Sequence, residues 1–255
     1  ASSADGTKLM AASVGQLYVS TDSGTNWTVR ESARVWTPVA SSADGTKLVA
    51  TAVDGQLYTS TDAGATWTAR ESNRAWRCVA SSADGTKLIF QSEREEGNPF
   101  YQIYLLDLET GDTERVSPGK GKTTCAWIHP DGKRVMFAST HENPEVEAQQ
   151  KAEYTERESG KARKYSWDYD AEFDIYETVP GSGEYKNLTK TEGYDAEGAW
   201  SPDGKKLVFA SNRQAYEGTM SEEDAKAFKL DKKFPMEIYL SDADGSNVER
   251  LTNAD

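Results

Sequence analysis

Hydrophobic residues in this chain occur in short runs that alternate with polar positions and end at turn residues. Residues 36–72 contain four such runs in succession: WTPVA, KLVATAV, QLYTST and TWTARES. Asp44-Gly45 and Asp54-Gly55 separate some of them, and such pairs are typical of tight turns between strands. The pattern predicts four short antiparallel strands joined by tight turns.

This unit of four strands is repeated along the chain. The nonapeptide ASSADGTKL occurs unchanged at residues 1–9, 40–48 and 80–88, and Trp27 and Trp67 lie 40 residues apart. A single four-stranded sheet cannot bury both of its faces, so such repeats are expected to pack against their neighbours. The architecture that arranges four-stranded sheets radially is the β-propeller, and we therefore expect an all-β fold.

The second half of the chain repeats the same unit with a different sequence, as HPDGKRVMFAST at 129–140 and SPDGKKLVFASNR at 201–213 show. The turns that number the units lie at Asp5, Asp44, Asp84, Asp131 and Asp203. We expect one five-bladed β-propeller domain over residues 1–255, with four-stranded antiparallel blades at about 1–34, 35–73, 74–118, 119–190 and 191–255. Residue 1 already lies in a turn, so the first blade is expected to lack its inner strand.

Two insertions interrupt the fourth and fifth repeats. Residues 141–171 are rich in helix-forming residues but have few apolar positions, so a helix there should lie on the surface. In residues 214–235, Ser221 and Asp224 have the spacing of a capping box. An apolar stripe follows, formed by Ala225, Phe228 and Leu230. We expect short helical insertions in both blades.

Eight positions near the N-terminus carry a resemblance to a known repeat. STDAGATW at 60–67 matches the Asp-box pattern S-x-D-x-G-x-T-W, and STDSGTNW at 20–27 matches it except at Asn26. Residues 1–88 therefore resemble the repeats of sialidase-like propellers. The matching positions are Ser20, Asp22, Gly24, Trp27, Ser60, Asp62, Gly64 and Trp67. We expect a structural role for them, since an aspartate in such a turn can accept hydrogen bonds from its own backbone and the tryptophan can pack beneath the hairpin.

The remaining residues, 89–255, resemble a different family. The strings xPDGKxLVFxS and DGSNVERLT are similar to the propeller repeats of TolB and of the TolB-like domains in prolyl oligopeptidase relatives. The change from one repeat type to the other falls near residue 89, within the third blade. These families are often extracytoplasmic, but the resemblance leaves the localisation of this chain unknown.

Charge and composition exclude several partners. The formal net charge is −13, so most of the surface should repel nucleic acid. We find no run of apolar residues long enough to span a membrane and no signal-peptide pattern, and we expect a soluble chain. Two cysteines and two histidines, without a C-x-x-C spacing, exclude an ordinary Cys/His zinc cluster, and we expect no cofactor.

The expected inner strands carry the candidate binding residues. Cys78, Cys125 and Glu197 each lie six residues before the aspartate of their turn, which makes them equivalent positions, and Pro38 takes that place in the second repeat. Trp127 and Trp200 disagree with this register by one residue, which indicates a β-bulge. Inner strands line the channel of a propeller, so the candidates for binding there are Arg77, Asp195 and Glu197. We expect both thiols to be reduced and buried.

Two acidic segments were weighed as metal sites. DADGSN at 242–247 resembles the start of an EF-hand loop but lacks its later glutamate and flanking helices, so a hairpin turn is favoured. WDYDAEFD places four acidic residues at alternating positions, which would point the same way on a strand. The four are Asp168, Asp170, Glu172 and Asp174. A solvated strand edge or the stem of an insertion is the commoner outcome, and we predict no metal site.

Three functions follow from these patterns. The favoured interpretation is a chain without catalytic function, engineered by fusing fragments of two propeller families and serving as a structural scaffold. The alternative is a TolB-like module that binds a protein or peptide. A glycan-binding or sialidase-like propeller is the weakest interpretation, because the Asp-box lies on the outer hairpin, away from the channel. The missing inner strand would also leave an edge open for self-association.

Overall fold

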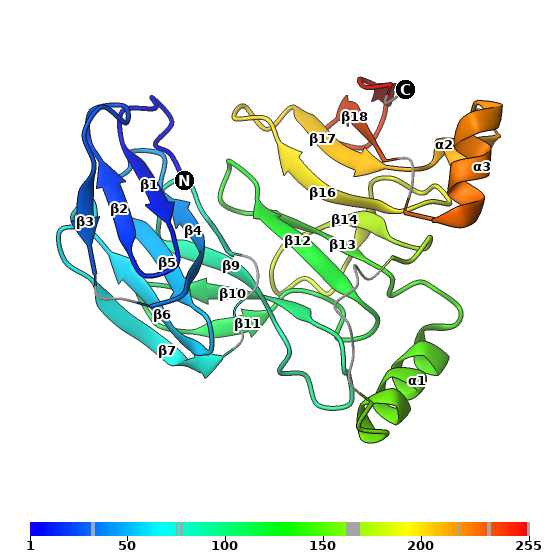
Figure 1. Cartoon of the computed structure of the whole chain (residues 1–255), viewed down its shortest axis with the longest axis horizontal. Coiled ribbons are helices and arrows are strands. Elements are labelled where there is room, and N and C mark those ends of the chain that lie inside the picture. Colours follow the sequence, from blue (N-terminus) through cyan, green and yellow to red (C-terminus); the bar gives the residue numbers. More distant parts are fainter. Residues whose placement is uncertain are drawn as a thin grey trace. The chain divides into compact units, whose positions relative to one another are not determined.

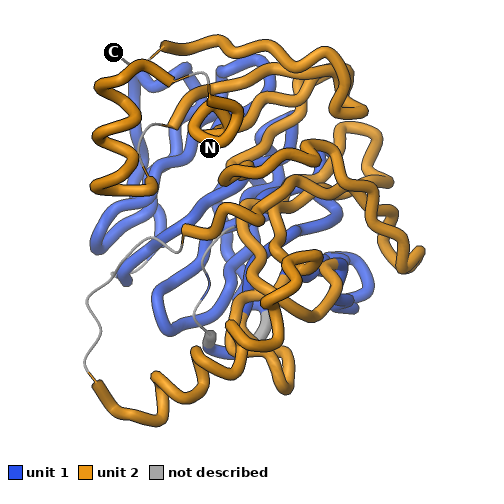
Figure 2. The backbone as a smooth tube through the Cα atoms, turned by 90° about the vertical axis from the view of Figure 1, so that its right-hand side faces the viewer, with its two compact units in different colours: residues 1–92, 103–116 blue, residues 93–102, 117–255 orange. Residues whose placement is uncertain are grey.

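The computed structural model describes residues 1–31, 34–74, 76, 79–161, 169–218, 220–233 and 236–253. The chain divides into two compact units (Figure 2). Unit 1 consists of residues 1–92 and 103–116, and unit 2 consists of residues 93–102 and 117–255. Within the described ranges, the regular structure consists of antiparallel sheets built from consecutive strands, with few helices, as a β-propeller requires.

Unit 1 contains three sheets (Figure 1). The first has three strands, β1 (Leu9–Ala12), β2 (Leu17–Ser20) and β3 (Thr28–Arg30). The second consists of β4 (Trp36–Ser41), β5 (Leu48–Ala52), β6 (Gly55–Ser60) and β7 (Thr68–Arg74). The third consists of β8 (Val79–Ser81), β9 (Lys87–Ser92), β10 (Gln102–Asp107) and β11 (Thr113–Arg115). The strands thus follow the runs that the hydrophobic pattern marked.

Unit 2 contains two sheets and the helices of both insertions. One sheet consists of β12 (Thr123–Ile128), β13 (Val135–Ser139), β14 (Asp174–Thr178) and β15 (Lys186–Asn187). The other consists of β16 (Asp195–Trp200), β17 (Lys206–Ser211), β18 (Glu237–Asp242) and β19 (Glu249–Arg250). Helix α1 (Val146–Glu158) lies between β13 and β14, and helices α2 (Gln214–Glu217) and α3 (Glu222–Leu230) lie between β17 and β18.

The second strand of a sheet forms the centre of each core. All five residues of β5 and of β13 are buried, because each strand has hydrogen-bonded neighbours on both sides and packed side chains on both faces. Aromatic rings fill the core between the second and third sheets of unit 1. The Phe90 ring contacts Trp76 edge-on with a centroid distance of 5.0 Å and stacks on Tyr104 at 5.8 Å. Such pairs add to the hydrophobic stabilisation of the core.

The repeated nonapeptide connects neighbouring sheets of unit 1. The backbone N–H of Ala4 donates to the carbonyl oxygen of Ala43 at 2.7 Å, and the N–H of Ala43 donates to that of Ala83 at 2.8 Å. The Gly45 turn also lies against the side chain of Lys8, so close that an added Cβ atom would be 2.8 Å from Lys8 Cβ. Each copy therefore contacts the next copy, which gives a physical reason for keeping its sequence unchanged.

The insertion helices lie on the surface of unit 2. Among the residues of α1, only Val146 is buried. Helix α3 begins after Ser221, whose side chain accepts a hydrogen bond from the N–H of Asp224. The Phe228 ring packs edge-on against Tyr216 at 5.6 Å. The expected apolar stripe ends there, because Leu230, the last residue of the helix, is 91% exposed.

Of the described acids in the alternating segment, only Asp174 lies in a strand, as the first residue of β14. Asp168 lies outside the described residues. Before β14, the Asp170 carboxylate accepts a hydrogen bond from the backbone N–H of Glu172, a local bond that competes with extended structure. Asp170 is buried and pairs with Lys122 at 3.5 Å. The described part of the segment thus lies in the stem of the insertion, and its acids do not share one strand face.

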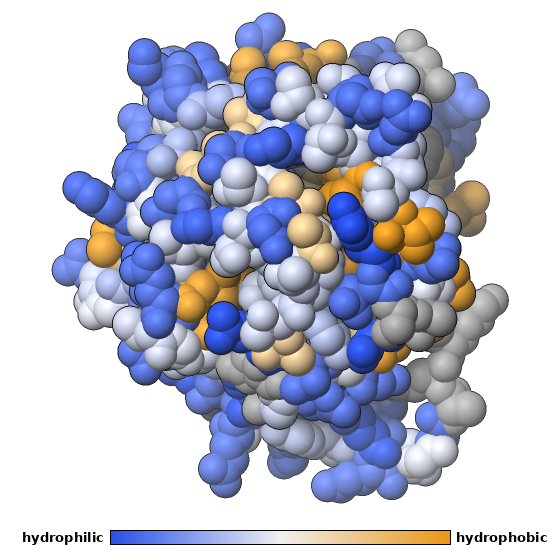
Figure 3. All heavy atoms as spheres, turned by 90° about the vertical axis from the view of Figure 1, so that its left-hand side faces the viewer, coloured by the Kyte–Doolittle hydropathy of each residue, from blue (hydrophilic) through white to orange (hydrophobic). Residues whose placement is uncertain are grey.

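The surface in Figure 3 is mostly hydrophilic, with hydrophobic residues in small separate groups. The segment DADGSN forms the turn between β18 and β19, as expected for a hairpin. In this turn Asp244 is exposed, and its Oδ1 atom accepts hydrogen bonds from the backbone N–H and the hydroxyl of Ser246. Among the described residues no helix is long and apolar enough to cross a membrane.

Candidate functional site

Two neighbouring edge strands of unit 2 carry matching β-bulges. The pairing of β12 with β13 shifts between Thr124 and Trp127, and the pairing of β16 with β17 shifts between Ala196 and Ala199. A bulge inserts an extra residue and bends the strand. Cys125, with a φ of 48°, lies in the first bulge, and the second bulge contains Glu197, with a φ of 52°. Both strands thus contain a β-bulge, but at equivalent positions, so the bulges do not produce the offset between Trp127 and Trp200 from which one was predicted.

The bulges bring Cys125 and Glu197 together. The Sγ atom of Cys125 lies 3.9 Å from Oε1 of Glu197, and the hydroxyl of Tyr194 donates to the same oxygen at 3.0 Å. Loss of hydration next to these groups raises the pKa of the Glu197 carboxyl, and the hydroxyl bond opposes that rise. Cys125 is half-buried, in contrast to the fully buried thiol that the sequence led us to expect.

The two tryptophans of these strands have different environments. In the first sheet of unit 2, Trp127 of β12 lies opposite Met136 of β13. In the second sheet, the same position of β16 is taken by Ala199, which lies opposite Val208 of β17. Trp127 is therefore equivalent to Ala199, and Trp200 lies one position further along its strand. Trp200 is 5% exposed, whereas Trp127 is 43% exposed. The indole of Trp127 is therefore available as a contact for a partner.

Asp195 has a different role from Glu197, although both lie on β16. It is fully buried, and its Oδ2 atom accepts a hydrogen bond from Nη2 of Arg213 at 2.8 Å. Burial raises the pKa of Asp195 to about 6 against the opposing effect of the guanidinium. The guanidinium in turn lies over the rings of Phe209 and Tyr239, 4.9 and 5.1 Å from their centroids. This buried ion pair joins β16 to the segment between β17 and α2, and it is not an exposed binding group.

Two further sequence candidates, Arg77 and Cys78, lie outside the described residues. Of the three proposed channel residues, the structure thus describes a buried Asp195 and an exposed Glu197. The sequence analysis did not select Trp127, Tyr194 or Arg213 for this site. The one-residue offset of Trp127 from Trp200 was the available signal, since it implies that the two side chains point in opposite directions from their strands.

The Asp-box residues form local turns in unit 1. The Oδ1 atom of Asp62 accepts hydrogen bonds from the Ser60 hydroxyl and from the backbone N–H of Thr66, both at 2.8 Å. Gly64 has a φ of 84°, and its carbonyl oxygen accepts from the Trp67 indole N–H at 3.2 Å. The first copy repeats this arrangement through Ser20, Asp22, Gly24, Asn26 and Trp27. In both copies the carboxylate bonds to its own turn.

Within the described part of the chain, no three His, Cys, Asp or Glu side chains are arranged to hold a metal ion.

Known proteins supply one further finding. No protein family model matches the sequence. Among solved structures, a putative TolB from Agrobacterium tumefaciens is 20% identical with a TM-score of 0.66, and the match covers 98% of this chain and 78% of that one.

Two other structures are similar to a lesser degree. TolB from Acinetobacter baumannii is 19% identical with a TM-score of 0.63, over 96% of this chain and 52% of that one. An oligogalacturonate lyase, described in complex with manganese, is 16% identical with a TM-score of 0.61, over 98% of this chain and 63% of that one. This chain thus spans about half the length of the Acinetobacter protein. Identities this low show the fold alone, and that fold is the one of the TolB-like β-propellers.

Proposed function

We propose that this chain is a non-enzymatic module that binds a protein or peptide at the exposed side of β12 and β16. The observation that carries the proposal is the exposed indole of Trp127 on β12, the edge strand of its sheet, which contacts β16, the edge strand of the next sheet, where Glu197 is exposed. Exposed aromatic side chains are frequent anchors in protein interfaces. Edge strands add backbone N–H and C=O groups with which an extended peptide can pair.

The charge of the chain favours a basic partner. The net charge is −13, and Glu197 contributes an exposed carboxylate at the site itself. Attraction between opposite charges raises the association rate and weakens with added salt. A lysine-rich segment with an apolar residue for contact with Trp127 is the partner that this chemistry fits.

The experiment uses short fluorescein-labelled peptides, one rich in lysine and leucine and one of equal length rich in glutamate and leucine. Fluorescence anisotropy should show binding of the first only. Trp127→Ala should weaken binding tenfold or more, whereas Trp27→Ala is the matched control because both indoles are 43% exposed. Absence of binding, or equal losses in the two variants, would refute the proposal.

The absence of catalysis is part of the same proposal. It is supported by the local hydrogen bonding of Asp22 and Asp62, which directs these carboxylates into their own turns. A sialidase-like site would need an acid and several arginines that converge on a substrate. Turnover of a fluorogenic sialoside or galacturonide would overturn this part of the proposal and favour a glycan-active propeller.

A second candidate is that the chain is a scaffold engineered from fragments of two propeller families. One observation favours it: the Asp-box hairpin of the second sheet is replaced in the third by the unrelated hairpin between β10 and β11. On this view the five sheets are five blades of one domain. A cooperative melt without binding of either peptide would favour the scaffold over the binding module.

The scaffold proposal includes self-association, in which copies of this chain associate through the first sheet. There β1 is an edge strand, and on its outer side it pairs with residues 1–3: Ala1 exchanges backbone hydrogen bonds with Met10, and the Ser3 N–H donates to the Lys8 carbonyl oxygen. The second half of β1, Ala11–Ala12, extends beyond this short segment. An edge with unpaired backbone groups can accept a strand from a second copy. Light scattering over a concentration series should then show a defined oligomer, and a monomer at every concentration would rule this out.

A further inference from the structure

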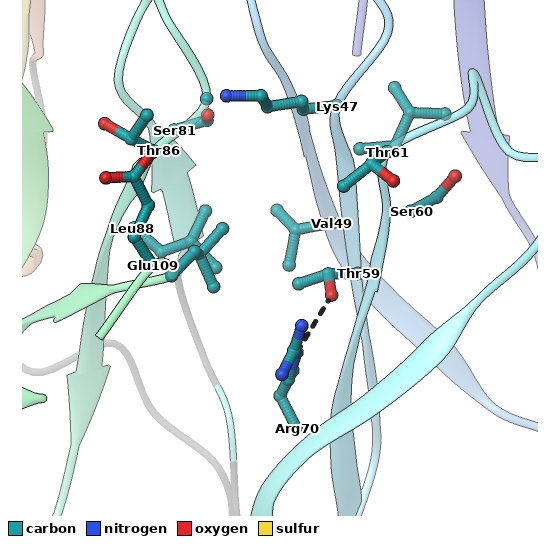
Figure 4. A pocket seen from close by; sticks show the side chains of 13 residues that line it. Lys47, Val49, Thr59, Ser60, Thr61, Arg70, Ser81, Thr86, Leu88 and Glu109 are labelled. Carbon is teal, nitrogen blue, oxygen red and sulfur yellow. Dashed lines mark hydrogen bonds between the residues drawn. The ribbon is translucent and has the colours of Figure 1, made fainter. Parts of the chain in front are cut away.

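A pocket of about 220 Å³ lies between the second and third sheets of unit 1. Figure 4 shows Leu88 and Glu109 on one side, Thr59 and Ser60 on the other, and Val49 between them. Lys47 and Arg70 lie at opposite ends. The pocket therefore combines an apolar floor with two cationic ends.

The corresponding space between the first and second sheets is filled. Met10, Val19 and Leu48 form a buried cluster there, and the half-buried Trp67 packs against it. The hairpin that carries Trp67 lies close to both sheets, since a Cβ atom added to Gly64 would be 3.2 Å from Val19 and 3.3 Å from Leu48. In this junction the indole covers the apolar surface.

The pocket residues are the repeat equivalents of that cluster. Alignment of KLM with KLV makes Met10 equivalent to Val49. Alignment of LYVS with LYTS makes Val19 equivalent to Thr59. Two copies of the nonapeptide make Leu48 equivalent to Leu88. All three residues of the second set line the pocket: Val49, Thr59 and Leu88. The same kind of apolar surface thus occurs at both junctions, but an indole covers it only between the first and second sheets.

The hairpin of the third sheet contributes different residues. In the second sheet the hairpin between β6 and β7 carries Trp67, which packs on the cluster of the first junction. The hairpin between β10 and β11 contributes Leu108 and Glu109 to the pocket instead. No tryptophan occurs in β10, in β11 or in the turn between them. The surface that an indole covers at the first junction therefore lines an open pocket at the second.

We propose that the pocket binds a small planar aromatic molecule of indole size. The volume suits it, because an engineered apolar cavity of about 150 Å³ binds benzene in another protein. Lys47 and Arg70 can contact the face of an aromatic ring through cation–π interactions. The site is separate from the peptide surface proposed on β12 and β16, so either proposal can fail without the other.

Isothermal titration of the full chain with indole tests the proposal. We expect one equivalent of indole to bind the unchanged protein. Val49→Phe, at the floor of the pocket, should fill it and weaken indole binding at least tenfold, whereas Val49→Ala, which leaves the pocket open, should retain it. Absence of heat at millimolar indole, or undiminished binding to a folded Val49→Phe variant, would overturn the proposal. If Val49→Phe does not fold, Thr59→Phe reduces the same pocket from its side.

The other junction supplies an independent measurement. Trp67→Ala should open the equivalent space against Met10 and Val19, so this variant should bind a second equivalent of indole. Trp27→Ala removes the more exposed indole of the first Asp-box and should keep the stoichiometry at one. A single equivalent bound by folded Trp67→Ala would contradict the equivalence of the two junctions, and with it the proposal.

Discussion

The Oδ2 atom of Asp195 lies 2.8 Å from Nη2 of Arg213, and both side chains are almost completely buried. Burial raises the pKa of the Asp195 carboxyl to about 6, above its ordinary value of 3.8. Between pH 3.8 and about pH 6, the Asp195 carboxyl has lost its proton in the unfolded chain but still holds it in the folded chain. The stability contributed by the protonated group is therefore full below pH 4 and is lost as the pH rises through 6.

Asp195→Asn should remove this pH dependence. The difference in unfolding free energy between the unchanged chain and the variant should fall by up to about 3 kcal/mol between pH 4 and pH 7. Urea titrations at a series of pH values measure it. Asp244→Asn is the control of opposite sign, because bonds to Ser246 lower the pKa of Asp244 and its contribution is lost as the pH falls. A flat difference for Asp195→Asn would contradict the raised pKa.

Gly85→Ala should destabilise the fold more than Gly6→Ala. Both glycines lie in identical nonapeptides and have similar positive φ values, 66° and 71°. A Cβ atom at Gly85 would be 2.7 Å from Lys47 Cβ, whereas nothing lies within 4 Å of one at Gly6. Backbone strain of about 1–2 kcal/mol is common to both, so the additional loss, about 1–3 kcal/mol, measures the contact between copies of the nonapeptide. Urea unfolding of the two variants is the comparison, and equal losses would show that this contact adds nothing.

Cys125→Gly should stabilise the bulge in β12. Cys125 has a φ of 48°, a conformation that costs about 1–2 kcal/mol for a residue with a Cβ atom. Glycine adopts it freely, whereas glycine in ordinary strand geometry costs about 0.5–1 kcal/mol. We therefore expect Thr124→Gly, its neighbour in the same strand, to be less stable than Cys125→Gly by about 1 kcal/mol or more. Thermal unfolding measures this, and the reverse order would show that the bulge does not need the left-handed conformation.

Ser221→Ala should loosen α3 without unfolding unit 2. The Ser221 side chain caps the helix by accepting from the Asp224 N–H at 3.1 Å, and loss of such a cap costs about 1 kcal/mol. No residue of α3 is buried, so the sheets do not depend on it. Hydrogen exchange at residues 222–225 should accelerate about fivefold, with Ser221→Thr as the control that retains a cap. Unchanged exchange would show that the hydroxyl contributes no cap.

The local part of this structure was open to prediction from the sequence. Alternating apolar positions and Asp-Gly turns are features of a few adjacent residues, and they led to the strands that the structure contains. The offset between Trp127 and Trp200 did not reveal the bulges, because both strands carry the bulge at equivalent positions and it shifts neither repeat relative to the other.

The sequence by itself determined the repeat, its strands and its turns, because these depend on local periodicity and backbone conformation. Only the tertiary structure decided that Asp195 is buried against Arg213 while Glu197, two residues away, is exposed beside Cys125. Equally, the absence of a tryptophan from the hairpin between β10 and β11 could be read from the sequence. Its consequence depends on which sheet each hairpin packs against, and packing of that kind is set by residues far apart along the chain.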